Sequence, residues 1–331
     1  MAEISIIMAA YNVEKYITEA IDSIIAQTFK EWELIICDDC SEDETVAVIK
    51  EYCKRDNRIR LIKRTSNSGG TRIPNRESAI AATASLIMTF DADDFLDCDY
   101  IEKLYIRKKQ TGANVVLSRL SFCNEKGETS QKIIPDDNFD YSQIISGKEA
   151  AKLTLGEVQI SISGLLIDKD IFIKNTTTFS KDIEECKYDE IDKRHLILQN
   201  KKVAFANTKY YYRQQPSSLM HNTGIKRYDF LKSIELIYKL AKENYTEKSV
   251  FEKLDNEFLT NLLFCQRDYY LYEHYKLKEK NIIHEKIKKA YKFAKSQQMK
   301  PFNLKQRSCM LSYYLFRIFS YIYSFYLKNR R

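Results

Sequence analysis

The feature that most constrains the fold is an apolar run that leads directly into three carboxylates. Residues 86–90 (LIMTF) are apolar or β-prone, and Asp91, Asp93 and Asp94 follow within four positions. Such a bounded apolar run predicts a buried strand, and ligands bind at the carboxyl ends of strands in parallel α/β sheets. Close carboxylates resist burial unless a cation or hydrogen-bond donors neutralise them, and hard divalent cations favour oxygen ligands. The run therefore predicts a cation site at a sheet edge, with a solvated acidic turn that caps the next helix as the alternative.

The beginning of the chain alternates between apolar runs of strand length and patterns of helical spacing. Strands are expected at residues 4–8, 32–36 and 60–63, and a helix follows each of them. Ser41 with Glu44 is a capping-box pattern, which predicts the start of the second helix. The alternation predicts an α/β fold with a Rossmann-like, mostly parallel sheet and helices on both faces. Right-handed crossovers then place the carboxyl ends of the strands at one edge.

Several polar residues follow these expected strands and should meet at that edge. They are Tyr11, Asp38, Asp39, Arg72 and the acidic group at 91–94. No G-x-G-x-x-G or Walker lysine motif follows the first strand, which argues against dinucleotide-binding and P-loop proteins. A GGTR string does occur at residues 69–72, but enzymes that make sugar nucleotides carry a similar string after the first strand. Nucleotidyl transfer is therefore kept as the weaker alternative activity.

Residues 101–223 continue the pattern less regularly. Helices are expected at 101–108 and 146–155, a polar loop at 123–138, and strands at 114–122, 160–167, 202–206 and 209–213. Asp189, Glu190 and Asp192 crowd the start of another helix, where carboxylates favour the N-terminal dipole. The alternative is that one of them faces the cleft. Arg213 and His221 lie in a turn-rich segment, from which a cation or an imidazole can reach a neighbouring site.

Five strings of residues together resemble the catalytic domain of glycosyltransferase family 2. In chain order they are ISIIMAAYN, IDSIIAQTF, WELIICDDCSEDET, SGGTRIPN and DADD. The resemblance spans about residues 4–221. It implies a GT-A fold and transfer of a sugar, with inversion, from a nucleotide diphosphate sugar such as a UDP-linked one. It also implies Mn²⁺ or Mg²⁺ as cofactor, and a glycan or lipid-linked hydroxyl of a cell-surface polysaccharide as acceptor.

The resemblance also implies roles for individual residues. The expected donor-binding residues, together with Arg213 of the turn-rich segment, are Ala9, Tyr11, Asp38, Asp39, Arg72, Asp91 and Ala92. The implied metal ligands are Asp93, Asp91 and His221. For the catalytic base, Glu190 matches by position and Asp189 by chemistry, so the assignment stays open, with Asp192 nearby.

Two departures from the family pattern affect these assignments. Relatives often carry Ala-Arg-Asn or Pro-Arg-Asn, whereas this chain has Pro74, Asn75 and Arg76. Relatives also usually present Glu-Asp as the catalytic pair, whereas the order here is Asp189 and then Glu190. The inverted pair keeps a second alternative open, a catalytically silent protein that binds nucleotide sugars or serves as a scaffold.

The sequence predicts two domains. Residues 1–223 form the expected GT-A catalytic domain, with a nucleotide-sugar half at about 1–100 and an acceptor half at about 101–223. Residues 224–331 are rich in helix formers and form the expected helical region. Amphipathic helices are expected at 228–242, 250–275 and 282–296.

The last segment, residues 309–327, is apolar and rich in tyrosine, with Arg317 as its one charge. Arg317, Ser320 and Ser324 fall along one narrow stripe of a helix, and basic residues flank the segment. The pattern predicts that residues 305–331 lie in the interface of an anionic membrane, with the aromatic side toward the lipid. The alternative is a helix that packs on the catalytic domain or on a second subunit of a homo-oligomer.

Composition limits the partners and the compartment. The chain is 44% hydrophobic and 30% charged with 4 Pro, which is typical of a globular protein. A net charge of +7 permits contact with an anionic partner, and no nucleic-acid partner is expected. The N-terminal MAEISIIMAAYN lacks the basic front and the cleavage site of a signal peptide. A cytoplasmic protein, peripheral on the inner face of the membrane, is therefore expected.

Overall fold

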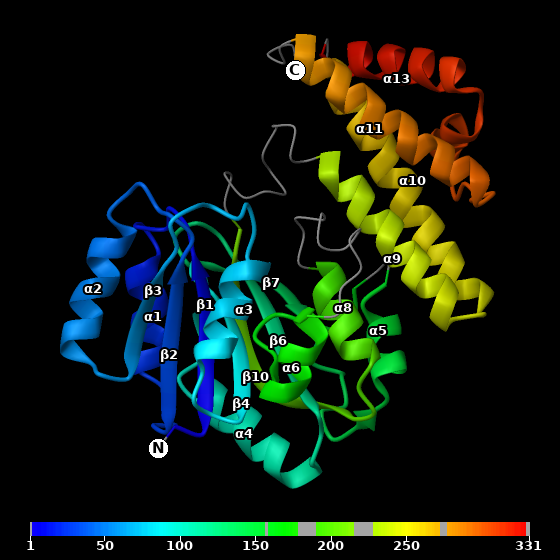
Figure 1. Ribbon diagram of the computed structural model, residues 1–331. Helices are drawn as coiled ribbons and strands as arrows, with labels where there is room; N and C mark the ends of the chain where they lie inside the picture. The colour runs from blue at the N-terminus through cyan, green and yellow to red at the C-terminus, as the bar shows by residue number, and fades with distance from the viewer. Residues whose placement is uncertain (1, 156–157, 178–189, 215–227, 272–276, 329–331) are drawn as a thin grey trace. The chain divides into compact units, whose positions relative to one another are not determined.

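The computed structural model describes residues 2–155, 158–177, 190–214, 228–271 and 277–328 (Figure 1). The chain divides into two compact units, Met1–Thr154 with Val158–Gln215, and Leu155–Glu157 with Pro216–Arg331. The domain boundary expected between residues 223 and 224 lies outside the described residues. Each unit is described by itself below.

The first unit is built on a sheet of ten strands, counted over the described residues. Its first four strands are β1 (Ile4–Ala10), β2 (Trp32–Asp38), β3 (Ile59–Lys63) and β4 (Leu86–Asp91). They lie in the order β3-β2-β1-β4, and all three pairings between them are parallel. This half confirms the expected α/β fold, because crossovers connect neighbouring parallel strands in the way that the alternating pattern predicts.

The second half of the sheet is mixed. Its strands are β5 (Phe95–Leu96), β6 (Val115–Cys123), β7 (Thr129–Ile134), β8 (Ile144–Ile145), β9 (Leu166–Asp168) and β10 (Val203–Arg213). The short strand β9 runs antiparallel to both β4 and β6, and therefore joins the parallel half to the rest. Strand β10 is parallel to β6 and antiparallel to β5, and it lies between these two strands in the sheet.

Helices cover both faces of the sheet (Figure 1). They are α1 (Ile17–Ile25), α2 (Thr45–Arg55), α3 (Arg72–Ala81), α4 (Tyr100–Thr111), α5 (Gly147–Leu153), α6 (Lys169–Thr177) and α8 (Glu190–Leu198). Side chains of α1, α2 and α4 join one buried cluster, and those of α3, α5, α6 and α8 join the other. A strand covered on both faces reads as a continuous apolar run, which explains the sequence of β1.

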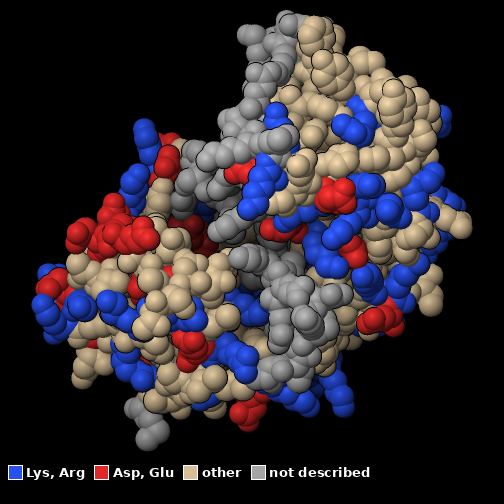
Figure 2. Space-filling model, turned by 45° about the horizontal axis from the view of Figure 1, so that its top comes forward, with Lys and Arg blue, Asp and Glu red and all other residues tan. Residues whose placement is uncertain are grey.

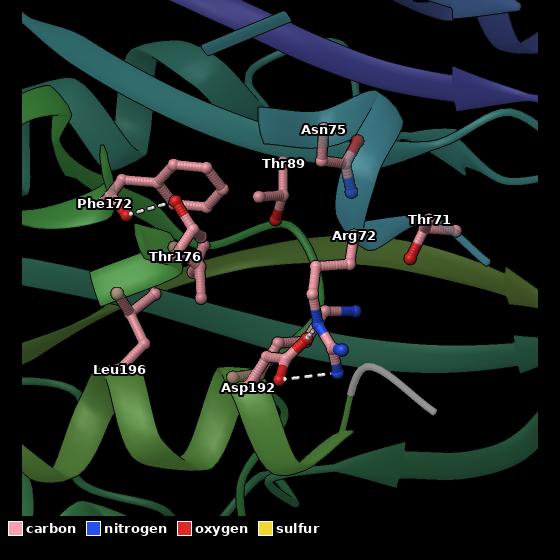
Figure 3. Close-up of a pocket in the computed structure, with 10 residues that line it drawn as sticks. Thr71, Arg72, Asn75, Thr89, Phe172, Thr176, Asp192 and Leu196 are labelled. Atoms are coloured by element: carbon pink, nitrogen blue, oxygen red, sulfur yellow. Dashed lines mark hydrogen bonds and ion pairs between the residues drawn. The ribbon is translucent and has the colours of Figure 1, made fainter. Parts of the chain in front are cut away.

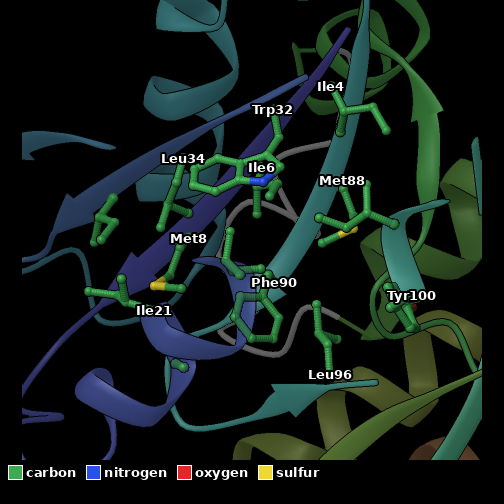
Figure 4. Close-up of a cluster of buried hydrophobic side chains, with 14 of the residues drawn as sticks. Ile4, Ile6, Met8, Ile21, Trp32, Leu34, Met88, Phe90, Leu96 and Tyr100 are labelled. Atoms are coloured by element: carbon green, nitrogen blue, oxygen red, sulfur yellow. The ribbon is translucent and has the colours of Figure 1, made fainter. Parts of the chain in front are cut away.

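Successive residues of the central strands belong alternately to the two buried clusters. Ile6 and Met8 lie in the cluster that contains Trp32 and Ile21 of α1 (Figure 4), whereas Ile7 lies in the cluster on the opposite face. Successive side chains of a strand point to opposite faces of the sheet. A shift of one residue in the register of β1 would therefore exchange its whole apolar set between the two faces.

Several local expectations are wrong, each for a tertiary reason. The capping box does not form, because the N-cap of α2 is Glu44 and the hydroxyl of Ser41 instead accepts a hydrogen bond from the main-chain nitrogen of Asn12 at 3.0 Å. The polar loop expected at 123–138 contains β7, which pairs with β6. The two strands expected at 202–206 and 209–213 are the single strand β10, with a register shift between Phe205 and Lys209.

The second unit is helical. It contains α9 (Phe230–Asn244), α10 (Lys248–Leu271), α11 (Leu277–Ser296), α12 (Leu304–Arg307), the 3₁₀ helix η2 (Ser308–Met310) and α13 (Tyr313–Lys328). Its core includes Phe258 of α10, Ile287 of α11 and Phe316 of α13, which are fully buried. A search of the described helices for length and hydropathy sufficient to cross a bilayer finds none.

Glu33 ties the base of the sheet to the segment before β4. Its side chain is buried, and Oε1 accepts hydrogen bonds from Ser5 Oγ at 2.5 Å, Thr83 N at 2.6 Å and Thr83 Oγ1 at 2.7 Å. Oε2 accepts from Arg60 at 2.7 Å. Burial alone would raise the pKa of Glu33, but these donors lower it to about 2.

We expect Glu33→Gln to lower the free energy of unfolding at pH 7 by about 2 kcal/mol, because a neutral amide replaces a carboxylate stabilised by four donors. A carboxyl with a lowered native pKa stabilises the fold above its ordinary pKa, and this contribution is lost as the pH falls toward 2. Urea unfolding at pH 7 and pH 3 should therefore show a smaller difference from wild type at pH 3. Glu31→Gln, at an exposed carboxylate nearby, is the control and should change little. Equal losses for Glu33→Gln at both pH values would contradict the expectation.

Candidate functional site

Three parallel strands end at the same level of the sheet. In the register of β1, Ala9 lies between Cys37 of β2 and Asp91 of β4, and Ala10 lies beside Asp38. The structure therefore brings together three residues that the sequence predicts at this edge, Ala9, Asp38 and Asp91. Ligands of α/β proteins bind at such an edge.

The loops after β1 and β2 hold each other in place. Asn12 Oδ1 accepts a hydrogen bond from Glu42 N at 2.8 Å, and Asn12 N donates to Ser41 Oγ at 3.0 Å. Asn12 has a positive φ of 51°, a conformation that asparagine tolerates better than most residues. Tyr11 precedes this turn, and its side chain is 45% exposed. The turn therefore presents an aromatic ring to solvent beside the ends of the strands.

The carboxylates of Asp38 and Asp39 position loops. Asp39 is buried, and its carboxylate accepts hydrogen bonds from Ser68 N at 2.9 Å and Ser68 Oγ at 2.8 Å, and from Arg64. Asp38 is also buried and accepts from Ser41 N at 3.3 Å. The structure thus uses both side chains to shape the edge, and direct contact of either one with a ligand stays a prediction.

Strand β10 holds the acidic turn that follows β4. The hydroxyl of Tyr210 accepts a hydrogen bond from Asp91 N at 3.1 Å and donates to Asp91 Oδ2 at 3.3 Å. The carboxylate of Asp94 is buried and accepts from Arg213 N at 2.8 Å. Ala92 is buried as well. The turn is therefore fixed from a strand far along the chain.

Burial and neighbouring negative charges disfavour the ionised form of the carboxylates in this turn. Burial and then the neighbouring charge of Asp91 raise the pKa of Asp93 to about 6. Burial, followed by the charges of Asp93 and Asp91, raises the pKa of Asp94 well above its ordinary value. A bound cation would favour the ionised form of such groups. The turn offers carboxylate oxygens, and binding of a cation to them stays a prediction.

The guanidinium of Arg213 fastens the turn to two other segments. It is buried, and donates from Nε to Asp93 O at 2.9 Å, from Nη1 to Glu125 O at 2.7 Å and from Nη2 to Glu19 Oε2 at 2.5 Å. Its centre also lies 5.3 Å from the ring centroid of Tyr16. Arg213 positions the acidic turn in this arrangement, and its expected contact with a ligand stays a prediction.

A pocket of about 450 Å³, partly open to solvent, lies on the face of the sheet covered by α3, α6 and α8 (Figure 3). It is lined by Thr71, Arg72, Asn75, Thr89, Leu165, Phe172, Thr176, Asp192, Lys193 and Leu196. Arg72 donates from Nε to Asp192 Oδ2 at 2.5 Å and from Nη2 to Asp192 Oδ1 at 2.9 Å. Thr89 lies two residues before Asp91 on β4 and therefore points to the same face. One lining residue of the pocket is thus two positions before Asp91 in the chain.

The structure describes the remaining predicted residues only in part. Asp189 and His221 lie outside the described residues. Glu190 is the first residue of α8, and the structure describes its backbone only. Within the described ranges, no group of three or more His, Cys, Asp and Glu side chains is placed to hold a metal ion. The roles of these three residues stay predictions.

Sequence reasoning missed Tyr210 as a partner of the acidic turn. Tyr210 is separated from Asp91 by 119 positions. No local pattern links the two. The sequence suggests Asp192 only as a candidate base. No pattern in the sequence predicts that it pairs with Arg72, which is 120 positions away.

Comparison with known proteins gives a family match and related enzymes. A family model described as Glycosyl transferase family 2 matches residues 5–173. The chain is 28% identical to the poly(ribitol-phosphate) beta-glucosyltransferase of Bacillus spizizenii, over 63% of this chain and 32% of that protein. It is 23% identical to the poly(ribitol-phosphate) beta-N-acetylglucosaminyltransferase TarS of Staphylococcus aureus, over 78% of this chain and 44% of that protein. The chain therefore spans less than half the length of these two relatives.

A solved structure shares the fold. The crystal structure of S. aureus TarS 1–349 in complex with UDP-GlcNAc superposes with a TM-score of 0.65 at 17% identity. The comparison covers 97% of this chain and 89% of that chain. A crystal structure of the same TarS residues in complex with UDP gives a TM-score of 0.59 at 19% identity. At this identity the likeness shows the fold.

We expect Arg213→Met to lower the free energy of unfolding by about 2–4 kcal/mol, because the carbonyl oxygens of Asp93 and Glu125 lose their donor. Hydrogen exchange of the amides at 91–96 should accelerate more than exchange in β1. Glu19→Gln is the control, because it keeps the hydrogen-bonding shape at a half-exposed partner and should cost less than about 1 kcal/mol. Chemical denaturation and amide exchange measure both effects, and unchanged exchange at 91–96 would contradict the positioning role.

Proposed function

The chain belongs to glycosyl transferase family 2, and from this premise we propose that it transfers a sugar from a UDP-linked donor to a hydroxyl of a cell-surface polysaccharide or lipid-linked glycan. The observation that carries the proposal is the register that brings Ala9, Asp38 and Asp91 to one edge of the sheet. A pocket lined by Arg72 and Thr89 lies on one face of the same sheet. The printed names of the two relatives describe transfer of glucose and of N-acetylglucosamine to poly(ribitol-phosphate), which supports a wall-polymer acceptor.

The donor is proposed to bind along the strand ends. The exposed ring of Tyr11 can stack against a nucleotide base, and the loops fixed by Asp38 and Asp39 flank it. Arg72 stands at the start of α3, where its guanidinium and the N-terminal dipole favour a diphosphate. Asp192 orients Arg72 toward the pocket through two hydrogen bonds. Donor binding in this proposal therefore depends on residues from both halves of the sheet.

Asp91 and Asp93 fit a divalent cation, Mn²⁺ or Mg²⁺, with His221 as an additional candidate ligand. Their carboxylate oxygens suit hard cations, and the raised pKa of Asp93 indicates negative charge that a cation would relieve. Mg²⁺ sites often use one or two carboxylates together with substrate phosphates, so a protein cluster of three ligands is not required. When bound, the ion neutralises charge on the departing diphosphate.

The reaction is proposed as a single displacement with inversion. The acceptor oxygen forms a bond to the anomeric carbon while the bond from that carbon to the diphosphate oxygen breaks, and the electron pair leaves with the UDP. A carboxylate at the start of α8, Asp189 or Glu190, takes the hydroxyl proton. Asp192 is held by Arg72, which favours the other two residues as the base.

We expect Asp93→Asn to reduce transfer from UDP-sugars by about 100-fold, because one ligand to the charge-neutralising cation is lost. Turnover is measured with a panel of UDP-sugars and with and without Mn²⁺. Asp140→Asn makes the same chemical change at an exposed position and is the control. Transfer by Asp93→Asn at the wild-type rate would contradict the role of Asp93. Release of pyrophosphate from UTP in the presence of a sugar 1-phosphate would identify a nucleotidyltransferase, and binding of UDP-sugars without turnover would identify a silent binding protein.

Kinetics should separate the base from the residue that positions Arg72. Replacing the base, by Asp189→Asn or Glu190→Gln, should lower kcat by about 100- to 10,000-fold with little change in donor affinity. Asp192→Asn should instead raise the KM for the donor, because Arg72 loses a charged partner. Steady-state kinetics with varied donor give both parameters. A loss of kcat for Asp192→Asn alone would move the base to Asp192.

A further inference from the structure

Helix α13 packs with its polar stripe toward the protein. Ser320 and Ser324 are buried against the unit's own helices, and the hydroxyl of Ser324 donates to Ser320 O at 2.7 Å and Arg267 O at 3.1 Å. Arg317 donates from Nε to the hydroxyl of Tyr270 at 3.1 Å. The stripe can be buried because main-chain carbonyls satisfy the serine hydroxyls and small side chains allow a close approach to α10. One face of the helix thus packs on the helices of its own unit, which is neither of the two packing partners expected from the sequence.

The opposite face of α13 is apolar and exposed. Ile318, Phe319, Ile322 and Phe325 are 40–60% exposed, and Tyr314 is 72% exposed. Helical spacing places Tyr314, Ile318, Ile322 and Phe325 on adjacent turns of one side. Soluble proteins rarely expose a contiguous apolar surface of this kind without a partner. The helix is therefore amphipathic, but its apolar side faces outward and its polar stripe faces the protein.

The C-terminal part of the chain, which carries this face, is basic. Residues 216–331 contain 23 Lys and Arg and 11 Asp and Glu, a formal net charge of +12, whereas residues 1–215 carry −5. Lys295 Nζ donates to Met310 O at 2.9 Å, and Lys305 Nζ lies 3.3 Å from the hydroxyl of Tyr323, so both amino groups lie at the border of α13. The second unit, at the upper right of Figure 2, combines a broad tan surface with Lys and Arg in blue. The partner of such a surface should be apolar and anionic.

We propose that the outer face of α13 binds the surface of an anionic lipid bilayer. Aromatic and aliphatic side chains bordered by lysine are the pattern of helices that lie in the membrane interface, where tyrosine is enriched. α13 has 16 residues, fewer than the ~20 that span a bilayer, which fits a helix lying in the plane of the interface. The charge asymmetry directs the second unit to the anionic headgroups. The contact would keep the chain close to a lipid-linked or membrane-proximal acceptor.

The test is flotation of the full chain with phosphatidylcholine vesicles, with and without phosphatidylglycerol. We expect binding to the anionic vesicles only, and a loss of roughly tenfold or more in the partition coefficient for the triple variant Ile318→Ser, Ile322→Ser and Phe325→Ser. Lys295→Gln and Lys305→Gln should each weaken binding about fivefold. Ile106→Ser, at an exposed apolar residue of α4, is the matched control and should bind like wild type.

Three outcomes would overturn the proposal. They are no flotation of the wild-type chain, equal binding to neutral and anionic vesicles, and wild-type binding by the triple variant. If the triple variant instead dissociates a dimer in light scattering without a change in flotation, the face is an interface with a second copy. Thermal unfolding shows whether each variant is folded. A thermal shift with UDP-sugars in solution reports donor binding separately, so failure here is distinguishable from failure of the proposed function.

Discussion

The structure depends on placing three carboxylates at the end of β4 and supplying hydrogen-bond donors for them. Asp91 ends this strand, and Asp93 and Asp94 follow it. Asp94 is buried, and an ionised carboxylate loses most of its hydration when it is buried. Strand β10 compensates part of that cost through the Tyr210 hydroxyl and the Arg213 main-chain nitrogen. Burial and the neighbouring carboxylates still raise the pKa of Asp93 and of Asp94. The proposed cation would act on this acidic turn.

Other acidic residues at the sheet organise the protein around that turn. Asp39 shapes the segment that leads to α3, Glu33 joins the strands to the chain before β4, and Asp192 orients Arg72. Each carboxylate is surrounded by donors from segments that are distant in sequence. Carboxylates in this unit therefore shape the structure around the candidate site, and acidic residue type alone does not identify a catalytic group.

The two units differ in the surface that they present. Residues 1–215 carry a net charge of −5 and hold the candidate site, whereas residues 216–331 carry +12 and expose the apolar side of α13. In the two proposals made above, the acidic first unit carries out the chemistry and the basic second unit determines the location. This division is consistent with an acceptor that is attached to, or made at, a membrane.

The sequence by itself determined the α/β fold class and the family, because strand and helix periodicity and the order of short motifs are local properties of the chain. It also predicted the common edge of Ala9, Asp38 and Asp91, since parallel crossovers fix where strands end. Only the tertiary structure decided that Tyr210 and Arg213 support the acidic turn, that Asp192 pairs with Arg72, and that the serine stripe of α13 faces inward. These contacts join positions that are far apart in the chain or depend on which side of a helix finds a partner. Local periodicity carries no information about such pairing, so packing alone determines it.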